Sequence, residues 1–464
     1  MNTSPDFEST LTPRRAAVIG ASMAGLLAAR VLAERFDEVV LLERDELPEH
    51  AAPRKGTPQA VQPHALLARG HQVIEALFPG FTDALLAQGG LLGDIGQDAA
   101  FDASGRRLAR RPLGIPGVLA SRLAIEAEIR RRVRALPNVR FMTGVDVQAP
   151  VHESARVTGV RWQPHGSAGT AQTLAAALVV DCTGRGSRSP AWLREWGYEA
   201  PHEERVTIGL AYTNAYFRRD GAERPSLAAV IGAATPAQPR PSVLIAQEPD
   251  AEGRARWVVG VGGYAGDHVP PTREAMAERA RATGQHEIAE LAERGELIGG
   301  VMPYGIPPTQ RRRYERLARL PEGYLAMGDA IASFNPIYGQ GMTVAACEAL
   351  ALREALRRGA KDLARRFFKA AAKVIDTPWQ LAVGGDLALP VVQGPRPFPV
   401  KLINAYVGRV QRVAVHDAVV AGAFIQVVHL LARPESLFAP RIVWRVWRGG
   451  RQQAGHGAAR TATA

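Results

Sequence analysis

The sequence predicts an α/β fold in which a parallel sheet with helices carries an inserted antiparallel sheet and a C-terminal helical element. Three observations support this prediction. Apolar strands run into glycine-rich turns at Gly20, Gly184 and Gly328. The stretch 206–264 is rich in β-branched and aromatic residues between Gly, Pro and Asp turns, as in antiparallel sheets. Residues 377–445 lie outside both patterns and indicate helices.

Composition and charge limit the classes of function. The 464 residues suffice for two or three packed domains, and 46% hydrophobic and 22% charged residues are ordinary for a soluble protein. The net charge of +12 comes mostly from arginine, without the basic–aromatic alternation of nucleic-acid grooves, so no nucleic-acid partner is expected. A solvated basic surface is the simpler interpretation, and attraction of an anionic partner is the alternative.

Cysteine use and the N-terminus indicate the compartment. Cys182 and Cys347 are the only cysteines, so neither a disulfide framework nor a metal site is expected. Residues 1–15 contain no apolar segment of the kind found in secretory signals. We therefore expect a cytoplasmic protein.

The first glycine turn joins a short apolar strand to a helix. Its pattern is GxSxxG, formed by Gly20, Ser22 and Gly25. Glycines permit a tight turn, the helix N-terminus can receive a pyrophosphate, and the Ser22 hydroxyl could donate to a phosphate. The next strand, 38–42, ends at Glu43, where dinucleotide-binding folds place a carboxylate on ribose hydroxyls. These features predict a Rossmann-like dinucleotide site; a packing turn without ligand is the alternative.

Two further strands end in comparable turns. The apolar run 174–180 leads to Asp181 and Gly184, and the run 324–327 leads directly to Gly328. In open α/β sheets, ligands bind at the carboxyl ends of the strands. We therefore expect all three loops to face a nucleotide at one edge of one sheet.

The third turn opens the loop around which the chain is organised. Pro336 stops any helix before it, and Gly339 and Gly341 let the backbone approach a ligand closely. The helical pattern from 342 to 356 directs free N–H groups and a positive dipole end at this loop. Asp329 can hold a hydroxyl beside that helix start. This combination suits a polyol chain next to an electron-accepting ring, which predicts a flavin.

The remaining elements follow from periodicity and turn residues. Arg122 lies in the first turn of a helix capped by Ser121, where a cation opposes the helix dipole. This suggests a local anion, with an exposed arginine as the alternative. The basic run 311–313 is expected to be a solvated strand edge. The other expected elements are the helices 65–77, 121–136, 272–281, 287–294 and 361–374, the hairpin 95–111, the strands 139–147, 206–218, 226–231, 242–248 and 257–264, and the loop 48–63.

The C-terminal region holds one strongly apolar segment. Residues 418–432 are apolar on nearly every side, but they fall short of the ~20 residues needed to span a bilayer. Core packing is expected, and a monotopic membrane contact is the alternative. The expected organisation is 12–94, 112–190 and 301–375 for the nucleotide-binding domain, 95–111 and 191–300 for the substrate domain, 376–448 for the C-terminal helices and 449–464 for a disordered tail.

The ordered motifs resemble class A flavoprotein monooxygenases over about residues 14–375. GxSxxG with Glu43 is similar to their FAD motif, and GDA…P…GQGM is similar to their third motif. DCTGRGSR is similar to the internal Asp-Gly motif, although Cys182 and Thr183 depart from its simplest form. Glu43-Arg44-Asp45, Gln62-Pro63 and GMTVA are most similar to squalene epoxidases and bacterial polyene epoxidases of polyether pathways.

The resemblance implies roles for individual residues. Glu43 would bind the ADP ribose, Arg122 the pyrophosphate or ribityl region, and Asp329 the ribityl chain, while 336–342 would flank the isoalloxazine. The match of Arg54 and Gln62 to flavin-contacting positions is looser. The full set expected to bind the cofactor is Gly20, Ser22, Ala24, Gly25, Glu43, Arg44, Arg54, Gln62, Arg122, Val147, Thr183, Gly184, Gly328, Asp329, Pro336, Gly339, Gly341 and Met342.

The resemblance also implies a reaction. FAD would form a C4a-hydroperoxide with O2 and insert one oxygen atom into a small apolar substrate, with epoxidation of a polyene or terpenoid expected first and aromatic hydroxylation as the alternative. Epoxidation needs no side-chain base, so we name no catalytic residue. Tyr338 and Asn335 are candidates for lining the ring, with a structural loop role as the alternative. No second dinucleotide motif is present, so NAD(P)H visits transiently or a partner flavin reductase replaces it.

Two other classes of function stay open. A flavin-dependent halogenase or double-bond reductase is the second hypothesis, although the sequence has no WxWxIP segment and no lysine directly following the Pro79 region. A non-catalytic FAD-binding protein is the third. The C-terminal helices are also similar to those of the epoxidases, which adds a peripheral membrane contact as an expected alternative.

Overall fold

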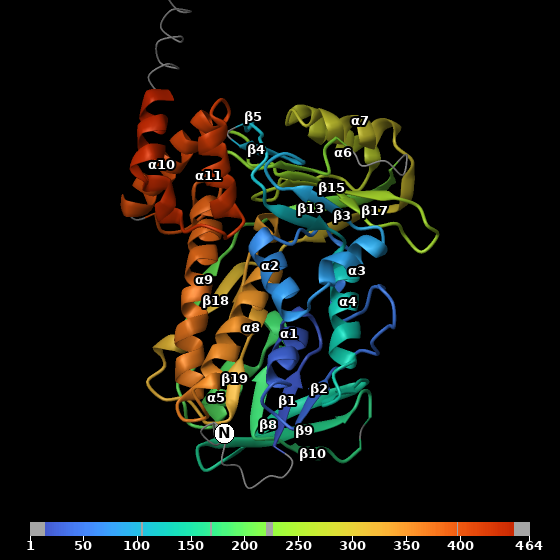
Figure 1. Cartoon of the computed structure of the whole chain (residues 1–464), viewed down its shortest axis with the longest axis vertical. Coiled ribbons are helices and arrows are strands. Elements are labelled where there is room, and N and C mark those ends of the chain that lie inside the picture. The colour runs from blue at the N-terminus through green and yellow to red at the C-terminus, as the bar shows by residue number, and fades with distance from the viewer. Residues whose placement is uncertain (1–13, 104, 168, 220–225, 397, 450–464) are drawn as a thin grey trace, which may run out of the picture.

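The computed structural model describes residues 14–449 except 104, 168, 220–225 and 397. The expected disordered tail lies outside the described residues from 450 onward. Figure 1 shows a parallel sheet at one end of the molecule, an antiparallel sheet at the other and the C-terminal helices beside the latter.

The first sheet is parallel and five-stranded, in the order β19-β11-β1-β2-β7. Its strands are β1 (Arg15–Ile19), β2 (Glu38–Leu42), β7 (Val139–Met142), β11 (Leu178–Asp181) and β19 (Tyr324–Ala326). Apart from the edge strand β7, the strands are mostly buried and apolar because both faces of the sheet are covered, as parallel sheets require. Since β1, β11 and β19 are parallel neighbours, the three glycine turns that follow them lie at one sheet edge, as predicted.

Helices cover one face of this sheet and a small antiparallel sheet covers the other. On the helical face, Val18, Leu41 and Val180 pack in one cluster with buried residues of the helices. On the opposite face, Val40 and Val179 pack in another. The helices are α1 (Met23–Leu32), α4 (Arg122–Arg134), α8 (Gly341–Arg357) and α9 (Leu363–Leu387), and the small sheet consists of β8 (Val145–Glu153), β9 (Arg156–Pro164) and β10 (Gln172–Ala175). The cap expected at Ser121 is present: its hydroxyl accepts a hydrogen bond from the N–H of Ala124.

Two runs expected as single strands are each divided between two sheets. The run 139–147 breaks at Gly144, which has φ +63°, so that β7 and β8 belong to different sheets. The run 174–180 breaks at Ala176 and Ala177, whose N–H groups donate to carbonyls of Thr158 and Arg15 respectively. In the second run the apolar residues continue through the break, so the sequence does not indicate the change of sheet.

The second large sheet has seven strands in the order β17-β13-β16-β15-β14-β4-β5. They are β4 (Ala99–Ala103), β5 (Arg106–Arg107), β13 (Ala211–Arg218), β14 (Ala229–Gly232), β15 (Ser242–Gln247), β16 (Arg256–Gly263) and β17 (Leu297–Gly305). The hairpin β4–β5 joins this sheet through β14, as expected, although the pairing of β4 with β14 is parallel. Helices α6 (Arg273–Ala282) and α7 (His286–Arg294) cover the outer face, where Phe217, Val259 and Met276 are buried. The inner face turns toward the first domain.

The expectation for the basic run 311–313 was wrong. It lies in and next to β18 (Thr309–Arg312), a strand that is buried at every position. The Arg311 side chain is 1% exposed and forms an ion pair of 2.7 Å with Asp376 of α9. Arg312 pairs with Glu203 and Arg313 with Glu204, two neighbouring residues of β12 (Glu203–Val206). The partner carboxylates come from distant segments, so the run alone resembles a solvated face.

The C-terminal region begins with a longer helix than expected. The helix predicted to end near 374 continues through Pro378 to Leu387, so the domain boundary expected at 375/376 falls inside α9. It is followed by α10 (Phe398–Ala414), α11 (Ala418–Val428) and a helix at 440–449. The apolar segment expected to pack in a core does so, because Val420, Phe424 and Val427 are buried in a cluster with α10 residues. Among the described residues, no helix has the length and apolar character needed to cross a membrane.

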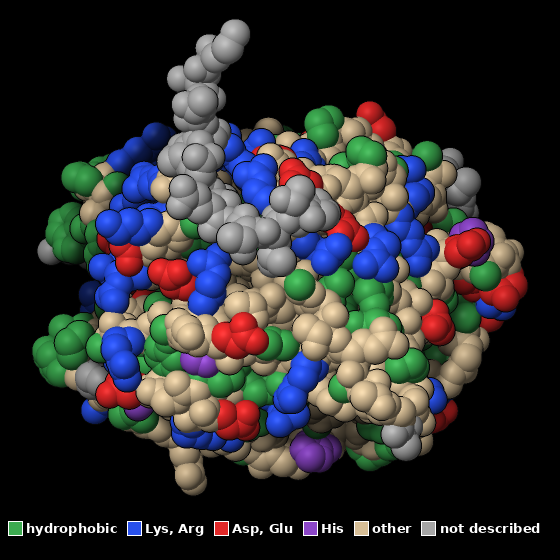
Figure 2. Space-filling model, turned by 90° about the horizontal axis from the view of Figure 1, so that it is seen from below, with side chains coloured by type: hydrophobic (Ala, Val, Ile, Leu, Met, Phe, Trp, Pro, Cys, Tyr) green, Lys and Arg blue, Asp and Glu red, His purple; other side chains and the backbone are tan. Residues whose placement is uncertain are grey.

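The remaining elements are short. They are α2 (Ala68–Leu77), α3 (Phe81–Ala87), α5 (Ser189–Glu195), β3 (Leu91–Asp94), β6 (Pro116–Leu119), β12 (Glu203–Val206), β20 (Ala332–Ser333), and the 3₁₀ turns η1 (Pro58–Val61), η2 (Gly184–Gly186), η3 (Tyr314–Arg316), η4 (Gly328–Ala330), η5 (Pro336–Tyr338) and η6 (Pro434–Phe438). The run expected as one strand from 206 to 218 is divided at Gly209, which has φ +57°. Figure 2 shows Lys and Arg interspersed with Asp and Glu over the face seen from below, with no continuous basic groove on that face.

Candidate functional site

A cavity of about 720 Å³ lies between the parallel sheet and the inner face of the seven-stranded sheet. Its volume is within the range of roughly 300–1,000 Å³ that is usual for small-molecule and cofactor sites. Of the residues expected to bind a cofactor, every one lines this cavity except Gly25. The structure therefore brings the predicted set together, while binding itself stays a prediction.

The three glycine turns pack directly on one another. Gly20 has φ +95°, and a Cβ there would lie 2.8 Å from the carbonyl oxygen of Cys182. A Cβ on Gly328 would lie 2.5 Å from the Cβ of Ala24, at the start of α1. Gly25 does not line the cavity because it packs α1 on the turn, where a Cβ would lie 1.8 Å from the carbonyl oxygen of Gly20. Glycine at these positions therefore lets the three turns pack closely on one another beside the cavity.

A buried ionic cluster supports the first turn. Glu43 accepts hydrogen bonds from the N–H groups of Ala21 (2.8 Å) and Asp45 (3.1 Å). The Arg54 guanidinium, 5% exposed, lies 3.4 Å from Glu43, 3.0 Å from Asp45 and 3.2 Å from Glu126. Burial alone would lower the pKa of Arg54, but these three carboxylates raise it. Arg54 therefore fixes the acidic side chains of the turn, which limits the flavin contact expected of it.

The hydroxyl of Ser22 is already engaged. It donates to Glu126 (2.7 Å) and accepts from the guanidinium of Arg122 (3.0 Å), so the phosphate bond expected of it is not available in this arrangement. The anion expected near Arg122 is Glu126, at 3.6 Å. Nε of Arg122 is buried without a hydrogen-bond partner in the described part of the chain, which leaves it able to hold a further anion. Sequence reasoning missed Glu126, although its spacing of four residues from Arg122 on one helix was a signal.

Asp329 and Glu348 occupy opposite sides of the third turn. The Asp329 side chain is exposed to the cavity. Its partial removal from solvent raises the pKa of its carboxyl, and the positive charges of Arg122 and Arg185 oppose that rise. Glu348 of α8 is fully buried beneath the turn and accepts a hydrogen bond of 2.6 Å from the N–H of Gly328. Burial, with a contribution from Asp329, raises the pKa of Glu348 to about 8, so its carboxyl is largely protonated at neutral pH. One acid therefore faces a ligand and the other supports the backbone.

The loop before α8 has the conformation that the sequence predicts. Gly339 is left-handed with φ +63°, and a Cβ on Gly341 would meet nothing within 4 Å, so the N-terminus of α8 is open. The Asn335 side chain accepts a hydrogen bond from the N–H of Ile337, and both residues line the cavity. Tyr338, the other candidate for lining the ring, instead directs its hydroxyl to Asp386 of α9, at 3.1 Å.

The far end of the cavity is mostly apolar and belongs to the seven-stranded sheet. On β13, Tyr212 and Asn214 point inward, where Gly262 and Gly260 of β16 leave room for them: a Cβ would lie 2.9 Å from the Tyr212 ring and 2.5 Å from Oδ1 of Asn214. The Tyr212 hydroxyl and Oδ1 of Asn214 are buried without a partner in the described part of the protein. The apolar residues around them are Ile231, Val243, Ile245, Ile306 and Phe334.

His64 also lines the cavity and is uncharged at neutral pH. Its Nδ1 lies 2.8 Å from the carbonyl oxygen of Gln62. Burial, together with the nearby Arg122, lowers the pKa of His64 to about 4. Gln62 is held in turn by the side-chain amide of Asn214. The loop that carries Gln62 therefore joins the two ends of the cavity.

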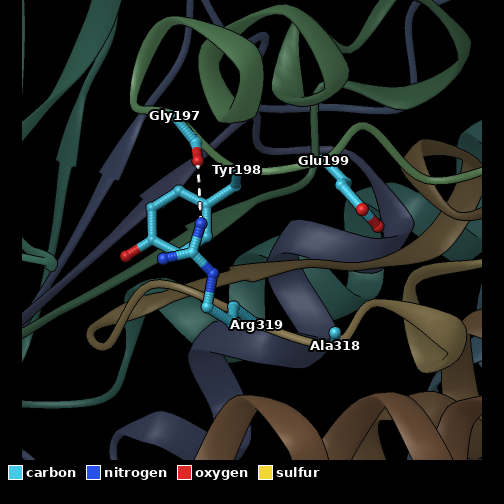
Figure 3. A pocket seen from close by; sticks show the side chains of 5 residues that line it. All are labelled: Gly197, Tyr198, Glu199, Ala318 and Arg319. Atoms are coloured by element: carbon cyan, nitrogen blue, oxygen red, sulfur yellow. Dashed lines mark hydrogen bonds between the residues drawn. The ribbon is translucent and has the colours of Figure 1, made fainter.

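A smaller cavity of about 230 Å³ lies elsewhere, at Gly197, Tyr198 and Arg319 (Figure 3). The Arg319 guanidinium donates to the carbonyl oxygen of Gly197 (3.1 Å) and lies 5.5 Å from the centre of the Tyr198 ring. Its charged group is thus already bonded, and no predicted site residue lies there. We assign no ligand to this cavity.

The residues of the large cavity fit an FAD. Two helix N-termini open onto it, and the glycine-rich turns that follow three strands line it. The free Nε of Arg122 suits a phosphate, and the exposed carboxylate of Asp329 suits the hydroxyls of a polyol. The donor set therefore matches a dinucleotide with a ribityl chain.

The chain is similar to one curated protein. Protein Rv3254 of Mycobacterium tuberculosis is 36% identical to it over 386 residues, which are 80% of this chain and 80% of that protein. No family model matches the chain.

Solved structures share the fold. A flavoprotein/dehydrogenase from Cytophaga hutchinsonii has a TM-score of 0.66 at 16% identity and covers 96% of this chain and 99% of that one. The flavin-dependent brominase Bmp2 has a TM-score of 0.61 at 15% identity, covering 89% and 92%. PqsL, a probable FAD-dependent monooxygenase from Pseudomonas aeruginosa, has 0.58 at 18%, covering 81% and 97%. The predicted fold class is confirmed, because the chain shares its fold with these flavoproteins.

Proposed function

The chain belongs to the same protein family as Protein Rv3254 of Mycobacterium tuberculosis, and we propose that it is an FAD-dependent monooxygenase. One observation carries this proposal: a single cavity joins the three glycine turns to the apolar inner face of the antiparallel sheet. A cofactor held by the turns and a substrate held by the sheet would meet inside that cavity without an intervening wall. The fold shared with a flavin-dependent brominase and a probable FAD-dependent monooxygenase supports the same conclusion.

The chain's own residues would bind, orient and exclude water. The N-termini of α1 and α8 would hold negative charge, Asp329 would accept hydrogen bonds from ribityl hydroxyls, and Glu43 from ribose hydroxyls. The loop from Pro336 to Gly339 would lie against the flavin ring. Bound FAD would supply the activation of O2 and the transfer of one oxygen atom to the substrate. NAD(P)H or a partner flavin reductase would supply the electrons.

The far wall of the cavity indicates the class of substrate. Its apolar side chains suit a small apolar organic molecule, and we propose epoxidation of an alkene, as in a polyene or terpenoid, as the first reaction. One observation favours aromatic hydroxylation as a second candidate. The hydroxyl of Tyr212 and Oδ1 of Asn214 offer a donor and an acceptor without partners, which a phenol could satisfy.

Two related activities are less well supported. No lysine is among the described residues that line the cavity. The described lining therefore lacks the lysine amine that the halogenase hypothesis would require. A double-bond reductase would use the same cofactor and an apolar wall, but it would not consume O2 in proportion to product.

The test is reconstitution with FAD followed by turnover. Purified protein with FAD and NADH, NADPH or a flavin reductase should consume O2 in step with oxygenated product, from a polyene or a phenol. Mass spectrometry with ¹⁸O2 should place one labelled atom in the product. Bromide or chloride in the assay would give a halogenated product only if the halogenase alternative holds. Preference for FMN, or reduction of substrate without O2 uptake, would refute the proposal.

We further propose that the C-terminal helices rest on an anionic lipid surface from which an apolar substrate enters. The apolar helix first considered for this role, α11, is buried, but its neighbours expose large apolar side chains: Phe398 (72%), Leu402 (56%) and Ile403 (50%) on α10, with Trp444 (52%) and Trp447 (56%) on 440–449. Residues 391–449 contain eight Lys and Arg but two acidic residues. Exposed tryptophan beside basic residues suits the interface of an anionic membrane.

The lipid contact is tested by sedimentation with vesicles. The protein should pellet with phosphatidylglycerol vesicles more than with phosphatidylcholine vesicles, and Phe398→Ser with Trp444→Ser should reduce this binding. Leu92→Ser is the matched control, because Leu92 is a large apolar residue with 38% exposure on β3. Equal pelleting of all proteins, or self-association that the double variant abolishes while vesicles are ignored, would contradict the contact.

A further inference from the structure

A buried carboxylate joins the C-terminal helix α9 to the loop beside the cavity. Oδ1 of Asp386 accepts hydrogen bonds from the hydroxyls of Tyr264 (3.0 Å) and Tyr338 (3.1 Å) and from Nδ2 of Asn335 (2.9 Å). Asp386 and Asn335 are fully buried, and Tyr264 is 2% exposed. The amide of Asn335 also donates to the hydroxyl of Tyr264, at 2.9 Å. One oxygen atom of α9 thus links this helix to Tyr264 and to the loop 335–338, which are distant from it in the sequence.

The cluster holds the backbone of the loop through Asn335. While Nδ2 of Asn335 bonds to Asp386, Oδ1 of the same amide accepts from the N–H of Ile337, at 3.2 Å. Pro336, Ile337 and Gly339 line the cavity where the loop meets it. A shift of Asp386 would therefore move a backbone segment that faces the ligand.

The helix is shaped to receive this loop. A Cβ on Gly385 would lie 2.4 Å from the hydroxyl oxygen of Tyr338, so only glycine allows the tyrosine to reach Asp386. The side of the cluster toward the seven-stranded sheet is closed by Tyr212, which packs with Tyr264 and Leu387. The hydroxyl of Tyr212 and Oδ2 of Asp386 are both buried and unpartnered among the described residues. Phenols and an amide, rather than a cation, therefore surround the carboxylate.

We propose that Asp386 is a positioning residue: through Asn335 and Tyr338 it holds the loop 335–339 in the conformation that the flavin ring requires. This inference rests on the proposed function. It makes oxygen transfer depend on a helix outside the three glycine turns. A misplaced loop would leave the ring exposed to water and poorly aligned with substrate, so reduced flavin would waste O2 as hydrogen peroxide.

The experiment compares Asp386→Ala, Asp386→Asn and Tyr338→Phe with wild-type holoenzyme. We expect Asp386→Ala to alter the flavin absorption spectrum, to lower kcat about tenfold or more with a smaller change in KM, and to divert O2 to hydrogen peroxide. Tyr338→Phe should do the same to a smaller extent. Asp386→Asn should recover part of the loss, because its amide oxygen still accepts from both tyrosines.

Matched measurements separate positioning from simple packing. Tyr406→Phe removes a hydroxyl that bonds the carbonyl oxygen of Leu437 (2.7 Å) in the C-terminal helices, and it should leave spectrum and coupling unchanged. If Asp386→Ala fails to fold, Tyr338→Phe carries the test alone. Variants that lose thermal stability but keep the wild-type spectrum, coupling and kcat would overturn the inference. Wild-type protein that binds no FAD would refute the proposed function itself, and the inference with it.

Discussion

The two ends of the cavity solve the burial of polar groups in different ways. At the end formed by the glycine turns, Glu43, Arg54 and Glu126 bond to one another or to backbone. At the end formed by the seven-stranded sheet, the hydroxyl of Tyr212 and Oδ1 of Asn214 have no partner in the described chain. A site whose charged groups are mostly paired, with Nε of Arg122 and the carboxylate of Asp329 left for the ligand, suits a ligand that is always present. A site with open valences suits a ligand that comes and goes.

The two ends of the cavity should also differ in how much they contribute to the stability of the fold. A buried ionic cluster loses much when one member is removed, because the remaining charges stay buried. An unpartnered hydroxyl contributes little to folding, and its removal can even be neutral. The glycine-turn end should therefore govern folding and cofactor retention, and the sheet end should govern substrate. Substitutions at each end can test whether the two ends are independent in this way.

The largest effect is expected for Arg54→Met. It would leave Glu43, Asp45 and Glu126 close together without their shared cation, at a cost of about 3–5 kcal/mol in the free energy of unfolding. Urea denaturation of the flavin-free protein measures this. Arg140→Met is the control, since that arginine is 52% exposed in its pair with Glu38 and should change stability by less than about 1 kcal/mol. Equal effects of the two changes would remove the basis of the comparison.

Glu348→Gln should change how stability depends on pH. The pKa of this carboxyl is raised to about 8 in the folded protein, from 4.5. Between these values the folded state binds more protons than the unfolded state, so the wild-type free energy of unfolding falls as pH rises from about 4.5 to 8, by a few kcal/mol. Glutamine keeps an acceptor for the N–H of Gly328 and removes this slope. Denaturation of both proteins at several pH values measures the difference, and parallel curves would refute it.

Asp329→Ala should weaken FAD binding with little change in melting temperature. The side chain is exposed to the cavity and makes no hydrogen bond or ion pair within the described residues, so folding does not use it. Loss of a charge-assisted hydrogen bond should cost about 1.5–3 kcal/mol of binding free energy. Titration of the apoprotein with FAD, followed by fluorescence, gives this value. Asp329→Asn should lose less, and an unchanged affinity in both variants would argue against the ribityl contact.

The smallest effect on stability is expected for Tyr212→Phe. The variant removes a buried hydroxyl that has no partner in the described protein, so the free energy of unfolding should change by less than about 1 kcal/mol. If the substrate is a phenol, KM for it should rise severalfold while FAD affinity stays the same. Turnover on a polyene without hydroxyl groups should be unaffected. A large loss of FAD would show that the two ends are not independent.

Much of the glycine-turn end could be predicted from the sequence, because its signals are local. The turn at Gly20, the cap at Ser121 and the strand ending at Glu43 each depend on neighbours within a few residues. The partners of Arg54 were harder to predict. Glu126 lies 72 residues away, on α4, and nothing near Arg54 indicates it.

The sheet end could be predicted only in outline. Alternation indicated antiparallel strands, but not that Tyr212 and Asn214 would lie over two glycines of a neighbouring strand. Asp386 lies 51 residues from Asn335 in the sequence, within a segment that indicated a helix and nothing more. Arg311 was expected to be solvated but is buried. Its partner Asp376 lies on a helix that is distant in the sequence, so the local pattern did not indicate the ion pair.

Because α9 is one continuous helix, it should couple the unfolding of the two cores that it joins. Its 25 residues extend about 37 Å, from Leu363 in the core beneath the parallel sheet to Leu387 against the seven-stranded sheet. A rod shared by two cores transmits loosening at one end to the other. Amide exchange along α9 should therefore report one opening event rather than two, and a protease that cuts after 376 should release a fragment only when the whole protein unfolds.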